Sequence, residues 1–200
     1  MDVFTAIKER RSVKHFDPDY KFTDAEEKKL LAAAILAPTA FNIQHWRFVV
    51  VRDPKVREEL KEAAWGQTQV TEASMLIVLC ADKAAWNKEP GRYWVNAPQE
   101  VQEYLVPKIS QYYEGSDRVQ QDECMRSCGI VAQTLMLAAK GMGYDSCPMD
   151  GFNFGKVAEI ISLPEDHVIS MFVAIGKAVS PANPRGGQLA LEEIVIEDSF

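Results

Sequence analysis

The order of helical and strand-like segments along the chain predicts an α+β domain. Three short apolar runs typical of buried strands, residues 48–51, 75–81 and 168–175, are separated by helical segments without regular alternation. No G-x-G-x-x-G sequence follows a strand, and there is no Walker glycine loop, so neither common nucleotide-binding arrangement is expected. With 200 residues and 47% apolar content, residues 1–200 can form a single well-packed domain.

The first third of the chain contains helices whose ends can be read from capping residues. Asp2 is expected to cap a short helix, and Thr23 with Glu26 forms a capping-box pattern at the start of a second. Pro38 ends the second helix, because the residue before a proline avoids the helical region. Asp53 and Pro54 then open a polar helix to about residue 64. Apolar residues of the first helix that we expect to face inward are Val3, Phe4 and Ile7.

Residues 86–122 differ in composition from the rest of the chain. Aromatic residues alternate there with charged ones, and prolines and a glycine interrupt the pattern. We interpret this segment as a helical excursion that covers a pocket. The alternative is a peripheral helical hairpin whose aromatic side chains only pack on the body.

The strongest helical pattern covers residues 123–140. Its broad apolar face consists mostly of small residues, which permits close approach of a second element. Gly141 and Gly143 follow this helix and are expected to cap it. A further helix is expected at about residues 154–161. The tail at 189–196 is compatible with a final strand that has no obvious partner in its own chain.

Composition excludes several classes of protein. The formal net charge of −7 and the pI near 5.1 argue against a general binder of nucleic acid or of anionic membranes. The four cysteines and three histidines show no metal-binding spacing, so no metal site is expected. No secretory signal pattern and no apolar run of membrane-spanning length is present, which predicts a cytoplasmic protein without a membrane partner.

Against this acidic background, Arg10-Arg11-Ser12-Val13-Lys14 places three cations and a hydroxyl within five residues. Clustered like charges usually meet an anion; the alternative is a solvated helix end. A second polar segment, residues 38–46, follows a helix stop and leads directly into an apolar strand. A phosphorylated ligand that also accepts hydrogen bonds could be held between the two segments.

These segments resemble the FMN-dependent nitroreductase family, and the resemblance extends over nearly the whole chain. The matching segments are residues 10–14, 37–48, 66–70 with 73–74, the glycines after the long helix, 148–152, and 175–177 followed by Pro184-Arg185. The resemblance implies a nitroreductase-like fold with a mainly antiparallel central sheet flanked by helices. It also implies a domain-swapped homodimer that exchanges its C-terminal strand and holds FMN at the subunit interface.

The resemblance assigns roles around the phosphate end of FMN. Arg10 and Ser12 would hold the phosphate and ribityl chain, and Arg185 would close the phosphate site. Arg11 would either share the phosphate through its backbone or point to solvent. Lys14 would lie near the flavin N1 and O2 edge, where a cation stabilises the reduced, anionic ring. Lys177 belongs to the same set of cofactor-binding residues.

Other assigned residues surround the flavin ring. Pro38, Thr39, Ala40 and Asn42 would come from the partner subunit; Ala40 stands where the family often has a serine, so one hydroxyl contact would be lost. Gln67 and Gln69 would meet the pyrimidine side or O4 of the ring. One of these positions is a lysine in some relatives, and its replacement would lower the flavin potential.

The loop of Pro148, Met149, Asp150 and Gly151 would pass beside flavin N5, with the Asp150 N–H steadying that atom. The alternative interpretation of this segment is an ordinary turn. The wall of the acceptor pocket is assigned to the aromatic excursion, in particular to Trp94, Tyr112 and Tyr113.

The implied activity is transfer of a hydride from NADH or NADPH through flavin N5 to a nitroaromatic or quinone-like acceptor, with ping-pong kinetics and no side-chain nucleophile. Two other functions fit the same resemblance. One is a specialised reaction, such as reductive dehalogenation or cleavage of the flavin itself. The other is an FMN-binding module without turnover.

Overall fold

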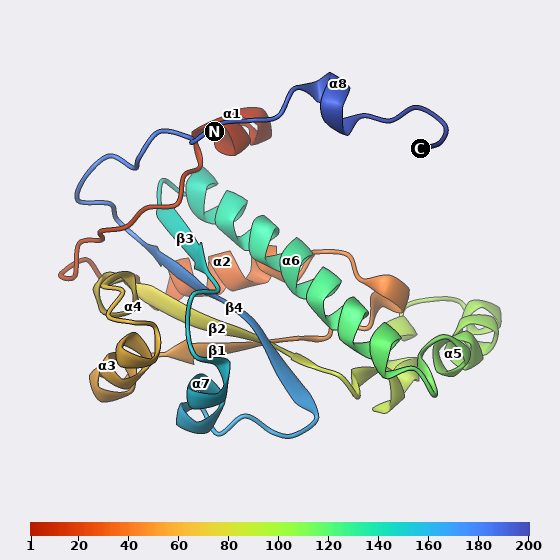
Figure 1. Ribbon diagram of the computed structural model, residues 1–200. Helices are drawn as coiled ribbons and strands as arrows, with labels where there is room; N and C mark the ends of the chain where they lie inside the picture. Colours follow the sequence, from red (N-terminus) through yellow and green to blue (C-terminus); the bar gives the residue numbers. More distant parts are fainter.

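A four-stranded antiparallel sheet with the strand order β1-β2-β4-β3 forms the centre of the molecule (Figure 1). The computed structural model describes residues 1–200. The strands are β1 (Trp46–Val51), β2 (Met75–Asp82), β3 (Asp145–Met149) and β4 (His167–Gly176). All eight residues of β2 are buried, as expected for a strand that has a neighbour on each side and helices on both faces. The α+β class with an antiparallel sheet is confirmed.

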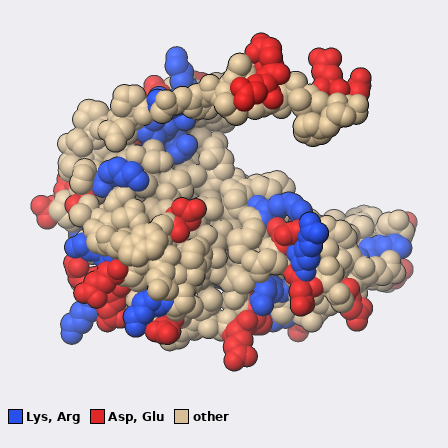
Figure 2. All heavy atoms as spheres, in the orientation of Figure 1, with Lys and Arg blue, Asp and Glu red and all other residues tan.

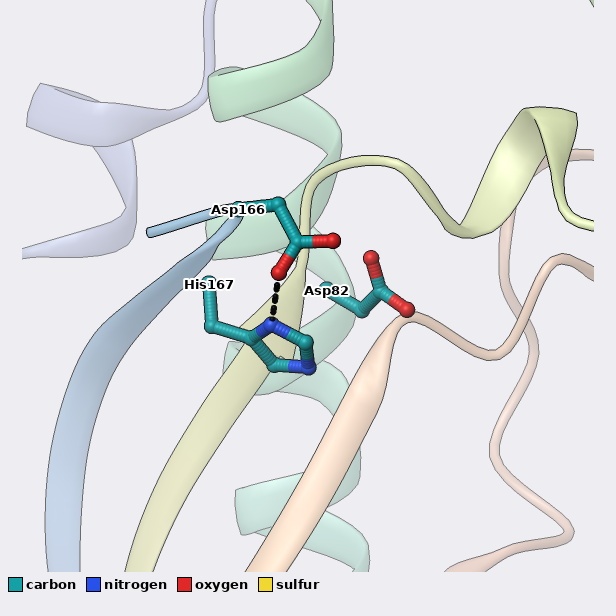
Figure 3. Close-up of side chains that lie close together, drawn as sticks. All are labelled: Asp82, Asp166 and His167. Atoms are coloured by element: carbon teal, nitrogen blue, oxygen red, sulfur yellow. Dashed lines mark hydrogen bonds and ion pairs between the residues drawn. The ribbon is translucent and has the colours of Figure 1, made fainter. Parts of the chain in front are cut away.

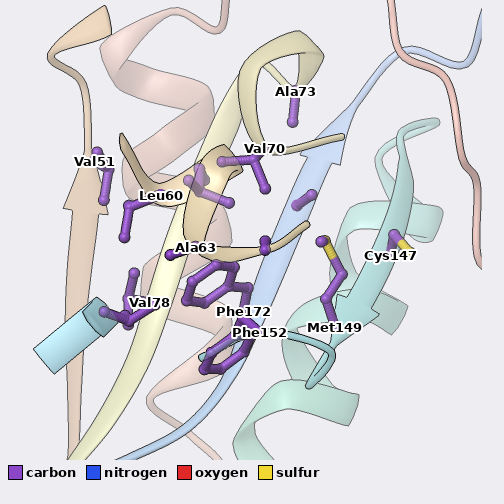
Figure 4. Close-up of a cluster of buried hydrophobic side chains, with 14 of the residues drawn as sticks. Val51, Leu60, Ala63, Val70, Ala73, Val78, Cys147, Met149, Phe152 and Phe172 are labelled. Atoms are coloured by element: carbon purple, nitrogen blue, oxygen red, sulfur yellow. The ribbon is translucent and has the colours of Figure 1, made fainter. Parts of the chain in front are cut away.

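Helices cover both faces of the sheet. On one face lie α6 (Asp117–Gly141) and α2 (Asp24–Ala34), packed against each other. On the other face lie α3 (Pro54–Ala63), α4 (Gln69–Glu72) and α7 (Phe154–Ile160). Alternate residues of the strands enter the two cores, so Ile77 and Leu79 meet α6 while Leu76 and Val78 meet α3 and α4. In the second core the rings of Phe152 and Phe172 stack with centroids 4.1 Å apart (Figure 4).

Local capping explains where several helices begin. Thr23 and Glu26 form the expected capping box, and Asp2 accepts a hydrogen bond from the Thr5 backbone N–H. Helix α6 begins six residues before the predicted start, because the Ser116 hydroxyl accepts from Val119 N and caps an earlier turn.

Strand β3 was not predicted as a strand. It is short and includes Pro148, which cannot donate to a ladder. Its place at the edge of the sheet makes the proline tolerable, and Pro148 lies opposite Val173 of β4. The segment Ser12-Val13 extends this edge, since Ser12 forms an isolated parallel bridge with Ser146.

Two predictions near the chain ends are wrong within the single chain. In α1 (Val3–Glu9) the side chains expected to face inward are open to solvent, with Phe4 79% exposed; only Ala6 is buried. The tail forms the short helix α8 (Leu191–Ile194) instead of a strand. The tail extends away from the body as an arm and meets no strand edge, so no ladder holds it extended (Figure 1). None of the helices combines the length and the apolar character that a membrane-spanning helix needs.

The excursion at 86–122 is mostly helical. It contains η2 (Ala85–Asn87), η3 (Pro90–Trp94) and α5 (Gln99–Tyr113), and α6 begins within it. Together with the loop that holds η1 (Ala40–Asn42), it forms a third small core. The fully buried members of this core are Ile43, Ala85, Ile109 and Tyr113.

His45 lies where this small core joins the body. Its side chain is fully buried, with Nδ1 3.2 Å from the Ser127 hydroxyl and the ring centroid 5.7 Å from that of Tyr113. Nε2 has no protein partner. Burial is the main cause that lowers the pKa of His45 from its usual 6.5 to about 4.

This pKa predicts that the protein loses stability in mild acid. Below pH 6.5 the unfolded chain binds a proton at this histidine, while the folded chain does not until about pH 4. The free energy of unfolding should therefore fall by about 2 kcal/mol between pH 7.5 and 5 on account of His45. Urea unfolding of His45→Gln should show a pH dependence reduced by that amount. His15→Gln, which changes an exposed histidine, is the control. If the pH dependence of the free energy of unfolding is unchanged in His45→Gln, His45 is not its cause.

Candidate functional site

A hollow of about 330 Å³ lies between the end of α1 and the start of the tail. Figure 2 shows Lys and Arg side chains gathered where the tail leaves the body, with Asp and Glu farther out along the tail. No carboxylate is among the residues around this hollow, which favours an anionic ligand. The polar residues around it are Arg10, Arg11, Ser12, Lys14, Asn183, Arg185 and Gln188. The two amides were not singled out from the sequence, because their Pro/Gly-rich segment has no periodicity.

Two of the four cations are held by backbone carbonyls at the end of α1. Arg11 Nη1 donates to Lys8 O at 2.6 Å and to Arg10 O at 2.9 Å. Arg185 Nη2 donates to Ile7 O at 3.1 Å and to Arg10 O at 3.2 Å. The last carbonyls of a helix lack partners within it and carry partial negative charge, so they stabilise both guanidinium groups.

Arg10 is different, because its Nη1 atom is buried and has no protein partner. Burial, together with the neighbouring charges of Arg185 and Arg11, lowers the pKa of Arg10 below its usual value. A guanidinium that is partly desolvated and repelled by two others is stabilised by an anion that accepts its free N–H. Among the three arginines of the hollow, Arg10 is thus the one with a buried donor that has no partner.

The site extends along the edge of the sheet that is formed by β3. Val13 N donates to Ser146 O at 3.1 Å, which fixes the Arg10–Lys14 segment beside β3. Lys14 Nζ lies 3.7 Å from Cys147 Sγ. Pro148 and Met149, predicted as part of a loop, belong to β3, and Asp150 and Gly151 follow directly. The predicted segments 10–14 and 148–151 therefore adjoin at this edge of the sheet.

The 148–151 loop is fixed by residues of the segment 65–69. Gln67 Nε2 donates to Gly151 O at 2.8 Å. A Cβ atom on Gly151 would lie 3.3 Å from the Trp65 ring, so glycine permits this close approach. Gln69 is buried in α4. Within the single chain, Gln67 therefore supports the loop predicted to face flavin N5.

The second predicted group, residues 38–42, lies elsewhere in the chain. Asn42 Nδ2 donates to Tyr93 O at 2.9 Å, and Trp94 Nε1 donates to Phe41 O at 3.1 Å. Phe41 and Asn42 both have positive φ angles, 51° and 57°. The excursion thus holds this loop in a conformation that it would not favour alone.

The other residues of this loop are exposed or half-buried. Pro38 is exposed, whereas Thr39 and Ala40 are half-buried, and the Thr39 hydroxyl accepts from Gln44 N at 3.0 Å. Helix α1 packs near the C-terminal end of α6, whereas the 38–42 loop lies toward its other end, beside α5 (Figure 1). A single chain does not bring the two predicted groups together.

Three of the predicted residues pack or form hydrogen bonds within the chain, away from the hollow. Lys177 Nζ donates to Gly143 O at 3.0 Å and lies over the Tyr144 ring, so it does not line the hollow. Tyr113 is fully buried and supports the excursion from beneath instead of forming a pocket wall. Tyr112 is 43% exposed and donates to Glu123 at 2.9 Å.

A separate group of ionisable residues lies at the far end of the sheet (Figure 3). Asp82, Asp166 and His167 present possible metal ligands within 4.8 Å of one another. Lys88 pairs with both carboxylates, at 2.9 Å from Asp82 and 2.7 Å from Asp166, and Arg47 also pairs with Asp82. Lys88 and then His167 lower the pKa of Asp166 to about 2. These carboxylates are already neutralised, so the cluster joins the excursion to the sheet and does not point to a metal.

Comparisons with known proteins agree with this architecture. The model of the nitroreductase family matches residues 7–177. Protein DrgA of Synechocystis sp. is 56% identical over 182 residues, which cover 91% of this chain and 87% of DrgA. MhqN of Bacillus subtilis, named as a proposed NAD(P)H nitroreductase, is 31% identical over 94% of this chain and 95% of its own.

A solved structure of a proposed nitroreductase from Exiguobacterium sibiricum, in complex with FMN, superimposes with a TM-score of 0.90 at 31% identity. The superposition covers 98% of this chain and 97% of the other. Together with the family model, which matches most of the sequence, these likenesses show that the chain belongs to the nitroreductase family.

Proposed function

We propose that this protein is an FMN-dependent oxidoreductase that takes two electrons from NADH or NADPH and passes them to a nitroaromatic or quinone-like acceptor. The observation that carries the proposal is the buried, unpartnered Nη1 of Arg10 in a hollow lined by four cations. Family membership supplies the anion that fits this hollow, since an FMN complex is known for a relative with the same fold.

The residues around the hollow suit a phosphate group. A guanidinium matches the oxygens of a phosphate through paired N–H donors, and its bonds to a charged acceptor are stronger than neutral ones. Ser12 adds a hydroxyl, and Asn183 and Gln188 add amides that can donate. With no carboxylate in the lining, nothing in the hollow repels the dianion.

The chain's own residues would then orient and tune the cofactor. When bound, FMN supplies the hydride-accepting chemistry. Lys14 would lie at the N1 and O2 edge and stabilise negative charge there, while the Asp150 N–H would donate toward N5. Gln67 and Gly151 keep this loop in place through the bond described above. No side chain is needed as a nucleophile.

We also propose that the active unit is a homodimer. The support for a homodimer is the distance between the two predicted groups, which lie toward opposite ends of helix α6. This helix has 25 residues and extends roughly 37 Å at about 1.5 Å per residue. Apolar side chains left exposed in α1 and the tail would be covered by a second subunit. They are Val3, Phe4, Ile7, Leu189, Leu191, Ile194, Val195 and Ile196.

Sedimentation equilibrium of the FMN-loaded protein should give the mass of two chains, because each flavin site needs residues from both. Deletion of residues 186–200 should reduce both dimerisation and flavin content. A truncated monomer with a full complement of FMN would contradict the shared site.

Anaerobic titration tests the activity directly. The yellow protein should bleach with NADH or NADPH and recover its colour when a nitroaromatic or quinone is added. Retained flavin that neither nicotinamide reduces would instead favour a binding module without turnover. Progressive loss of the FMN chromophore under oxygen would favour cleavage of the flavin itself.

The phosphate site predicts unequal effects for neighbouring arginines. Arg10→Ala should weaken FMN binding about ten- to a hundredfold, the effect of losing a charge-assisted hydrogen bond. Arg11→Ala should weaken it much less, because that guanidinium is already bound to carbonyls of α1. Dissociation constants from flavin fluorescence compare the two, and equal losses would show that the phosphate lies elsewhere.

Lys14 should affect the flavin potential more than flavin binding. In Lys14→Gln the reduced ring loses its nearby cation, so the two-electron potential should fall by about 30 mV or more, which is the equivalent of a tenfold change in equilibrium constant. Lys8→Gln, which changes an exposed lysine of α1, is the matched control. Spectroelectrochemistry that gives the same potential for both variants would remove Lys14 from the ring edge.

A further inference from the structure

Ser146 in β3 carries a buried hydroxyl without a partner. The residue is 1% exposed, and its Oγ atom forms no hydrogen bond within the protein. It lies between Asp145 and Cys147 in a strand that is paired to β4 through its backbone. An unsatisfied hydroxyl in the interior is destabilising relative to a paired one, so its presence needs a physical reason.

The position of Ser146 in the sheet places it beside Ser12, a residue of the phosphate hollow. Ser12 and Ser146 are bridge partners, and paired residues of adjacent strands present their side chains on the same side. Ser12 lines the hollow. Cys147, the next residue of β3, packs in the core on the opposite face. The hydroxyl of Ser146 therefore lies on the hollow's side of this edge.

Arg10 also lines the hollow, two residues before Ser12. Arg10 Nη1 and Ser146 Oγ are thus two buried polar atoms without protein partners, and Ser12 lies between their residues in this arrangement. Both can donate a hydrogen bond, and an acceptor with several oxygens would satisfy both.

We propose that Ser146 is a further ligand of the cofactor, with its hydroxyl donating to an oxygen of the phosphoribityl chain of FMN. This inference rests on the proposed function and adds a residue that the motif of Arg10 to Lys14 does not contain. In the free protein the hydroxyl gains nothing; in the complex it forms a hydrogen bond in a buried setting, where such a bond is strong.

The test uses the opposite consequences of Ser146→Ala for the two forms of the protein. In the flavin-free protein the substitution removes an unpaired polar atom, so the free energy of unfolding in urea should stay the same or rise. FMN should bind about tenfold more weakly, as expected for the loss of one buried hydrogen bond to the ligand. Fluorescence titration of the flavin-free protein with FMN measures the second effect.

Ser74→Ala is the matched control, because the Ser74 hydroxyl already donates to Tyr20 O at 2.8 Å. It should destabilise the flavin-free protein and leave FMN affinity unchanged. An FMN affinity of Ser146→Ala within twofold of the wild type would overturn the inference. So would a loss of stability in the flavin-free variant as large as that of Ser74→Ala, since the hydroxyl would then have a partner within the protein. A wild-type protein that does not bind FMN would instead overturn the proposed function.

Discussion

The packing of α6 on the central sheet is the constraint on which the rest of the arrangement depends. Its small apolar residues allow the helix to lie close to β2 and β4, so the helix is fixed along its length. One end of α6 supports α1 and the cationic hollow, and the other supports the excursion and the 38–42 loop. A rigid element that separates two half-sites favours an assembly in which each half meets its complement on a second copy of the chain.

Electrostatics at the end of α1 decides what the hollow can bind. Four cations in one place repel one another, and the carbonyls of α1 compensate only part of that repulsion through Arg11 and Arg185. Arg10 remains partly buried with an open donor. The net charge of the whole chain is −7, so this excess of positive charge is local and not a property of the protein's surface in general.

The sequence was most informative where a feature is local. The capping box of Thr23 and the apolar runs that became β1, β2 and β4 can each be read from neighbouring residues, although β1 lies at an edge and is only half-buried along most of its length. Features that depend on distant contacts were not predictable. Strand β3 exists because β4 offers it an edge, Tyr113 is buried because the 38–45 loop returns to cover it, and the outward face of α1 has no core beneath it. The anion site was predictable in its residues, whereas the difference between Arg10 and Arg11 arises from how α1 ends.

The third core links the 38–45 loop to the excursion at 86–122. Ile43 of the loop and Tyr113 of α5 are both fully buried there, and the bonds from Asn42 to Tyr93 and from Trp94 to Phe41 cross between the same segments. Residues with positive φ would relax if these contacts were lost, because only surrounding structure holds non-glycine residues in that conformation. In the proposed dimer this loop would face the partner's flavin and the excursion would lie over the acceptor. Changes in the excursion that alter the choice of acceptor would then also shift the contacts to the ring, and packing in the third core would couple binding of the acceptor to tuning of the flavin.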